Sequence, residues 1–123
     1  MATIKELTLE LDKNQIETGE NLRCFIMIRY DGRYDSLVIN SQIEDSSDIF
    51  NFINVNGKNI SHPYARLSLL KHDIPPSEEI EFTIKTSHVP LHGTSNAKLR
   101  VSLIQEHKEI ISTVTYLTII EKN

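Results

Sequence analysis

The segment whose residue types could do chemistry is SHVPLHG, at residues 87–93. It places His88 and His92 four residues apart, on either side of Pro90. Imidazole nitrogens bind metals, but a zinc site needs three or four ligands that converge on the ion. Histidines at this spacing share one face only in a helix, which a proline disfavours. The segment therefore predicts a loop with two solvated histidines, and a metal site at these residues is the alternative hypothesis.

The acidic segment EDSSD, at residues 44–48, is a second candidate for metal binding. It contains Asp45 and Asp48, and Asp31 and Asp35 lie in the turn before it. Calcium takes several oxygen ligands, so two such loops at one end of a domain could form a calcium site. Aspartate and serine also favour ordinary turns. We interpret the segment as a solvated connection and predict no cofactor, with calcium binding as the alternative.

No residue of the sequence stands out as a nucleophile activated for catalysis. The single cysteine, Cys24, lies among alternating apolar residues, where a buried thiol is inert. No serine stands in a Gly-x-Ser-x-Gly motif, and the four glycines are too scattered to cradle a phosphate. The chain is therefore predicted not to be an enzyme.

Composition and charge are those of an ordinary globular protein. The sequence has 123 residues, of which 39% are hydrophobic and 24% charged, and its formal net charge is −4. Its 13 lysines and arginines are scattered, so no basic patch predicts binding to nucleic acid. The sequence has no apolar stretch of membrane-spanning length, and its opening MATIKELTLELD lacks the apolar core of a secretory signal. We expect one domain over residues 1–123 and a cytoplasmic location, which the lone cysteine also fits.

Period-two alternation dominates the chain and must position these candidates. Apolar and polar residues alternate over residues 7–11, 22–30, 80–84 and 99–103. Such runs are typical of strands with one buried face. The residues expected to face the core are Leu22, Cys24, Ile26, Ile28, Phe82, Ile84, Leu99, Val101 and Leu103.

Turn residues separate these runs and set the predicted fold. A positive φ is expected at Gly19 and Gly32. Asn56-Gly57 predicts a β-hairpin, and residues 105–108 predict a second, tight β-hairpin. Pro75-Pro76 marks a connection. Residues 46–53 are predicted as a strand, because their aromatic and β-branched residues outweigh a possible helix cap. The predicted fold class is all-β, an antiparallel immunoglobulin-like β-sandwich of seven to nine strands.

The segment LTLELDKNQIETGENLRCFIMIRY, residues 7–30, resembles the opening of immunoglobulin-like sandwiches. Arrestin-like and macroglobulin-like domains open in this way, with a short crossover, here containing Ile16, and Gly19-Glu20 before a long strand. IPPSEEIEFTIK, residues 74–85, is similar to an arrestin-like strand entry. The resemblance covers about a third of the chain. It implies one sandwich that serves as a scaffold for binding other proteins.

The last predicted strand, residues 108–120, is unusually long and apolar on both faces. One face carries Ile111, Leu117 and Ile119, and the other carries Ile110, Val114, Tyr116 and Ile120. A bend near Ser112-Thr113, taking the strand from one sheet to the other, would explain this pattern. The alternative is contact with a protein partner or a second copy, by edge pairing or face packing, through Ile111, Val114, Tyr116 and Ile120.

The predicted function is therefore a non-enzymatic protein-interaction module. The alternative is a metal-binding β-sandwich that uses His88 and His92 or the acidic residues Asp45 and Asp48. A carbohydrate-binding module is less favoured, because the sequence has no tryptophan and only four tyrosines.

Overall fold

The computed structural model describes residues 5–122, and most of this range is β-structure. The strands are β1 (Leu7–Leu11), β2 (Gln15–Glu17), β3 (Leu22–Ile28), β4 (Ser36–Ile43), β5 (Asn51–Val55), β6 (Lys58–His62), β7 (Arg66–Leu70), β8 (Glu79–Lys85), β9 (Thr94–Gln105) and β10 (Lys108–Ile120). A 3-10 turn, η1 (Lys71–Asp73), follows β7. The all-β prediction is confirmed.

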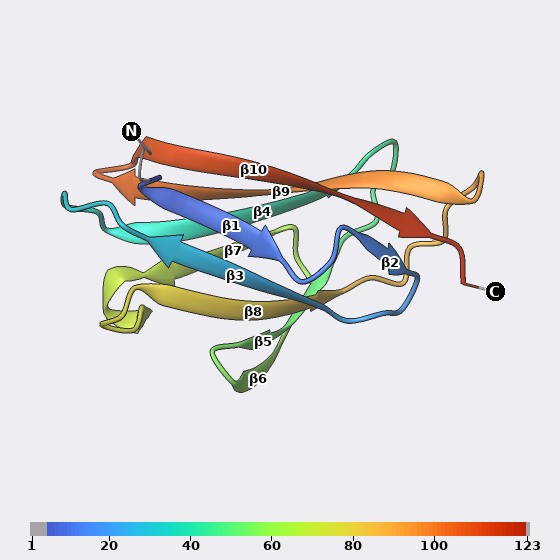
Figure 1. Ribbon diagram of the computed structural model, residues 1–123, viewed down its shortest axis with the longest axis horizontal. Coiled ribbons are helices and arrows are strands. Elements are labelled where there is room, and N and C mark those ends of the chain that lie inside the picture. Colours follow the sequence, from blue (N-terminus) through green and yellow to red (C-terminus); the bar gives the residue numbers. More distant parts are fainter. Residues whose placement is uncertain (1–4, 123) are drawn as a thin grey trace.

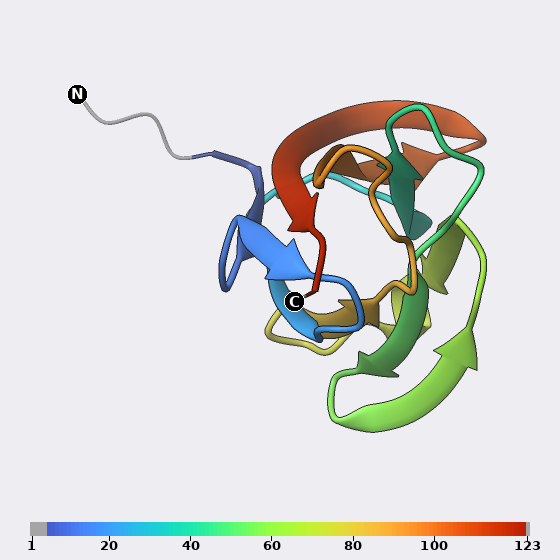
Figure 2. The same ribbon diagram turned by 90° about the vertical axis from the view of Figure 1, so that its right-hand side faces the viewer.

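The strands form two five-stranded sheets that enclose one core. The first, called here the β3 sheet, has the order β1-β3-β8-β5-β6. The second, called here the β10 sheet, has the order β2-β10-β9-β4-β7. Figure 1 shows the sheets as two layers, and Figure 2, a view along the strands, shows how the β10 sheet curls around the core.

The predicted number of strands was too low, because two segments are divided more finely than their sequence suggests. Residues 7–17 form both β1 and β2, which belong to different sheets. After the predicted Asn56-Gly57 hairpin, residues 58–70 form two short strands, β6 and β7. The strand predicted over residues 46–53 begins only at Asn51, because Ser46 Oγ accepts a hydrogen bond from the Asp48 amide at 2.9 Å and holds a turn there.

The sheets are antiparallel except at one position. Residues Gln15–Glu17 of β2 pair in parallel with Thr118–Ile120 of β10. The chain leaves the β3 sheet after Leu11 and joins the edge of the β10 sheet beside its last strand. This crossing places β2, rather than the start of the chain, beside the last residues of β10.

The predicted inward-facing residues form the core. All nine of them, on β3, β8 and β9, are buried, as the period-two pattern predicted. Phe52 of β5 extends the core, and its ring lies 5.9 Å from that of Phe82. Burial also raises the pKa of the Cys24 thiol well above its ordinary value, with a smaller contribution from Asp12. The cysteine is therefore a packing residue.

The predicted hairpins are confirmed, and one predicted glycine conformation is wrong. Asn56 and Gly57 have φ values of 52° and 84°, as a two-residue hairpin between β5 and β6 requires. Gly19 also has a positive φ, of 84°. Gly32 does not, although a Cβ at this position would meet the end of the Tyr30 side chain.

Replacing Phe82 with alanine should lower the free energy of unfolding by about 3–5 kcal/mol, because the ring is fully buried between the sheets. The measurement is equilibrium unfolding in urea. Phe25 on the outer face of β3, half-buried beneath the Arg23 guanidinium, is the matched control and should cost clearly less. A loss below about 1 kcal/mol for Phe82→Ala would contradict the assignment of the buried face.

Candidate functional site

His88 lies in the connection between β8 and β9, and it is buried rather than solvated. Its exposed fraction is 7%. The prediction of two solvated histidines was therefore wrong for His88. The physical reason is that residues 86–91 keep the alternation of a strand, with Thr86, His88 and Pro90 turned inward and the residues between them exposed.

Both ring nitrogens of His88 have hydrogen-bond partners. Nδ1 lies 2.7 Å from Asp48 Oδ2, and Nε2 lies 2.8 Å from Ser95 Oγ. Ser46 Oγ is a more distant neighbour of Nδ1, at 3.4 Å. Because an ionised carboxylate only accepts hydrogen bonds, we assign the proton of the neutral ring to Nδ1. Nε2 is then the acceptor for the Ser95 hydroxyl.

The main chain around His88 is fixed by two threonines. The Thr18 hydroxyl donates to the His88 carbonyl oxygen at 2.7 Å. The His88 amide donates to Thr86 Oγ1 at 3.1 Å, and that hydroxyl in turn donates to the Ile49 carbonyl oxygen at 2.9 Å. We call Thr18, Ser46, Asp48, Thr86, His88 and Ser95 the His88 network. It joins the β2–β3, β4–β5 and β8–β9 connections at one end of the sandwich.

Asp48, a predicted calcium ligand, contacts His88, but the other predicted metal ligands do not join this pair. His92 and Asp45 are exposed, although both line a pocket that His88 also reaches. Asp35 lies at the opposite end of β4 from Asp45, so the idea of two acidic loops at one end was wrong. Its carboxylate accepts a hydrogen bond from the Glu106 amide at 2.7 Å in the β9–β10 hairpin. Residues 5–122 contain no group of three or more His, Cys, Asp or Glu placed to hold a metal ion.

The outer face of the β10 sheet is the second candidate site. Tyr116 and Val114 point outward from β10, with exposed fractions of 69% and 38%. Ile120 is half-buried on the same face, whereas Ile111 packs against the core and does not belong to this surface. The predicted bend near Ser112-Thr113 is instead an irregularity between Glu109 and Ile111.

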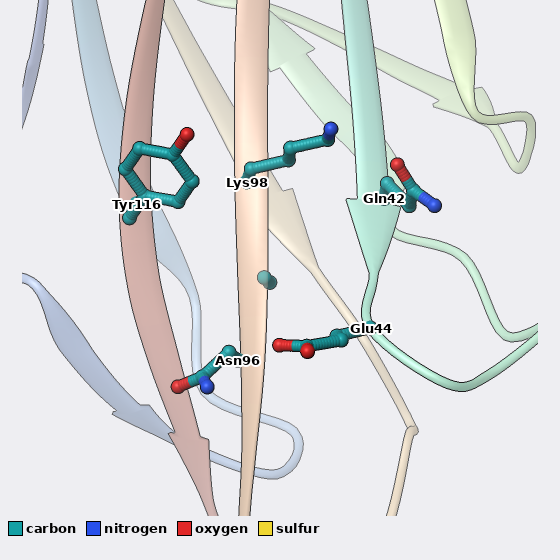
Figure 3. Close-up of a pocket in the computed structure, with 6 residues that line it drawn as sticks. Gln42, Glu44, Asn96, Lys98 and Tyr116 are labelled. Carbon is teal, nitrogen blue, oxygen red and sulfur yellow. The ribbon is translucent and has the colours of Figure 1, made fainter.

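Tyr116 borders a shallow pocket of about 330 Å³ on this face. Its ring, Lys98 and Gln42 lie side by side across β10, β9 and β4, with Asn96 and Glu44 in the next row (Figure 3). Glu44 and Asn96 also line the pocket of about 210 Å³ that holds His88 and Ser95. The two hollows are therefore neighbours with a shared wall.

Four members of the His88 network, Thr18, Ser46, Thr86 and Ser95, were missed by reasoning on the sequence. Ser95 lies two residues before Ala97 and four before Leu99, so the period-two pattern of β9 would have turned it inward. Thr18 and Ser46 gave no comparable signal. Their contacts with His88 join residues that are 70 and 42 positions apart.

No family model and no curated protein matches the sequence. Solved structures that resemble the fold include the Reelin-N domain of F-spondin, with TM-score 0.59 and 13% identity over 100% of this chain and 92% of that one. A conjugative transposon lipoprotein from Bacteroides eggerthii has TM-score 0.56 and 14% identity over 93% of this chain and 96% of that one. The Salmonella SafD adhesin has TM-score 0.51 and 10% identity over 97% and 100%.

One further structure of similar likeness, AvmM, is described as catalysing macrocyclization in alchivemycin A biosynthesis, with TM-score 0.53 and 12% identity over 96% of this chain and 90% of that one. At these identities the likenesses show the fold alone. They support a β-sandwich-like fold without singling out arrestin-like or macroglobulin-like domains. Within residues 5–122, no helix is long and apolar enough to cross a membrane.

Replacing His88 with alanine should lower the free energy of unfolding by about 2–4 kcal/mol, because it leaves a cavity and deprives the Ser95 hydroxyl of its partner. His92→Ala, in the same loop, should change it by less than about 0.5 kcal/mol. Urea unfolding of both variants checks this. Equal, small effects would mean that the His88 network does not hold the loops together.

Zinc, copper or calcium at tens of micromolar should leave the melting temperature nearly unchanged, because within residues 5–122 no third candidate ligand joins His88 and Asp48. A ligand at about 100 times its Kd would add about 2.7 kcal/mol of stability. Differential scanning fluorimetry with and without a chelator makes the comparison. A rise of several degrees that His88→Ala or Asp45→Ala abolishes would restore the metal-binding alternative.

Proposed function

We propose that the chain acts as a protein-interaction module and that its contact surface is the outer face of the β10 sheet around Tyr116. The observation that carries this proposal is the exposed aromatic ring beside exposed Val114, on a sheet face bordered by a shallow pocket. Tyrosine is enriched at the energetic centres of protein interfaces, because its ring is rigid, largely apolar and able to form a hydrogen bond. Binding at this face needs no cofactor and no catalytic group.

Polar side chains beside Val114 are already held in place. Arg100 donates to Glu109 Oε2 at 2.7 Å and to Ser112 Oγ at 3.1 Å. Ser102 donates to the other oxygen of Glu109 at 2.8 Å. A partner that packs on this face therefore meets groups whose side-chain freedom is reduced, which lowers the entropic cost of binding.

Face packing is better supported than pairing along the edge of β10. Close to its carboxyl end, β10 already pairs with β2. Further back, the Thr115 hydroxyl donates to the Leu9 carbonyl oxygen of β1 at 3.2 Å, so β1 lies against that edge. Near the hairpin, the irregularity between Glu109 and Ile111 disturbs the strand. Bulges and neighbouring segments are common protections against edge pairing.

The names of the similar structures agree with a binding function. A reeler domain and an adhesin are among them. Lipoproteins are also among them, so these names do not favour the cytoplasmic location expected from the sequence. We propose partner binding or adhesion for this chain, with residues 1–123 as one interaction domain.

The simplest partner is a second copy of the chain, so light scattering at tens of micromolar should detect a dimer. Tyr116→Lys should convert it to a monomer without unfolding it, because a charge would be buried without a partner in the interface. Ile120→Lys should weaken the dimer in the same direction.

Tyr64 provides the matched control, because it is 63% exposed but lies between β6 and β7, outside the proposed surface. Tyr64→Lys should leave the dimer intact. A monomeric wild type would contradict self-association, and equal effects of the two tyrosine substitutions would contradict the position of the surface.

A further inference from the structure

Asp48, His88 and Ser95 stand in the order used for nucleophilic acyl transfer. The carboxylate contacts Nδ1 at 2.7 Å and the hydroxyl contacts Nε2 at 2.8 Å. In such an arrangement the carboxylate fixes the imidazole tautomer, and the free nitrogen accepts the hydroxyl proton. The three residues come from the β4–β5 connection, the β8–β9 connection and the start of β9, so only the fold brings them together.

The hydroxyl and the imidazole also share access to one hollow. The pocket of about 210 Å³ is lined by His88 and Ser95 together with Leu91, Asn96, Glu44 and Asp45, among others. A histidine that served packing alone would need both nitrogens satisfied, as here, but would not need its serine partner in the wall of a pocket. We propose that Ser95 is a nucleophile activated by His88, at a site that goes beyond the proposed binding function and does not depend on it.

The reaction follows from the positions of the protons. Ser95 Oγ attacks the carbonyl carbon of an ester while its proton moves to His88 Nε2. The bond from that carbon to the leaving alcohol breaks, and the alcohol oxygen takes the proton from His88. Water then attacks the acyl carbon and gives a proton to His88. The bond from that carbon to Ser95 Oγ breaks, Oγ takes the proton back from His88, and the acid is released.

The pocket indicates the substrate class. Its volume of about 210 Å³ is smaller than the roughly 300–1,000 Å³ typical of drug-sized ligands, so the acyl group is short. Glu44 and Asp45 disfavour an anion, and Leu91 offers an apolar contact. Small neutral or cationic esters fit these walls.

Asp48 is a positioning residue, and its effect should be modest. Its side chain is 59% exposed, so water screens the charge that would stabilise the imidazolium of His88. The corresponding aspartate of a serine protease is buried, and its loss lowers kcat by about 10⁴-fold. Here, Asp48→Asn should slow the reaction of Ser95 only by about tenfold.

The test uses diisopropyl fluorophosphate on the folded full-length chain, followed by intact mass and peptide mapping. Ser95 Oγ forms a bond to phosphorus, the bond to fluorine breaks, and hydrogen fluoride is released. We expect one adduct per chain, located on Ser95, that is absent in Ser95→Ala and at least ten times slower to form in His88→Gln. Ser87→Ala, an exposed serine of the same loop, is the matched control and should label at the wild-type rate.

A second readout is the release of about one equivalent of p-nitrophenolate per chain in a rapid burst from p-nitrophenyl acetate, lost in Ser95→Ala. Circular dichroism checks that each variant is folded. If His88→Gln does not fold, the labelling rate of Asp48→Asn is compared with that of the wild type instead. An absence of label on Ser95 under conditions that label a known serine hydrolase would overturn the proposal. Labelling of Ser95 in folded His88→Gln and Asp48→Asn at the wild-type rate would overturn the proposal as well.

Discussion

A buried imidazole must have hydrogen-bond partners at both nitrogens, and this requirement at His88 organises one end of the molecule. An unpaired polar group in such a place costs about 1–3 kcal/mol, a large part of the stability of a small domain. Asp48 and Ser95 meet the requirement for the ring, and Thr18 and Thr86 meet it for the main chain. The loops that bring these residues are consequently held to one another. The exposed Val89 and Leu91, on either side of buried Pro90, are presented from a fixed segment.

The path of the first strands has a comparable effect on the surface around Tyr116. Because the chain crosses from the β3 sheet to the β10 sheet between β1 and β2, both strands lie beside β10. They protect its edge and leave its outer face open. The 13-residue strand β10 therefore exposes apolar side chains to solvent. Where β1 and β2 lie beside it, its backbone is not free to pair with another strand. This separation of face from edge explains why β10 is apolar on both sides.

The sequence predicted those features that depend on neighbouring residues and on period two. The inward faces of β3, β8 and β9 follow from alternation alone, and the hairpins follow from Asn56-Gly57 and from the polar residues 105–108. The role of His88 could not be predicted in this way. Its partners Asp48 and Thr18 are 40 and 70 positions away, and only the packed fold brings them within reach. Pro90, between the two histidines, made the whole segment look like a solvated loop, although its buried positions keep the alternation of β8.

The parallel pairing of β2 was missed for the same reason. A three-residue strand has no periodicity to detect, and its partner lies at the other end of the chain. The break between β6 and β7 was also missed, because each of these strands is too short for alternation to outweigh the turn between them.

The two candidate sites are neighbours that share a wall. Glu44 and Asn96 line both the hollow beside Tyr116 and the pocket of Ser95. Asn96 and Lys98 alternate outward along β9 while Ser95 turns inward at its start, so one strand serves both hollows. The Glu44 amide donates to the Asn96 carbonyl oxygen at 2.8 Å, which fixes this shared wall. A ligand that crosses the Tyr116 face toward the loop end would pass this wall before it meets the Ser95 hydroxyl. Of the charged residues, Lys98 lines the hollow beside Tyr116, Asp45 lines the pocket of Ser95, and Glu44 lines both. The negative charges beside Ser95 therefore favour a ligand whose end nearest Ser95 is neutral or cationic. The small pocket shows the same preference by itself.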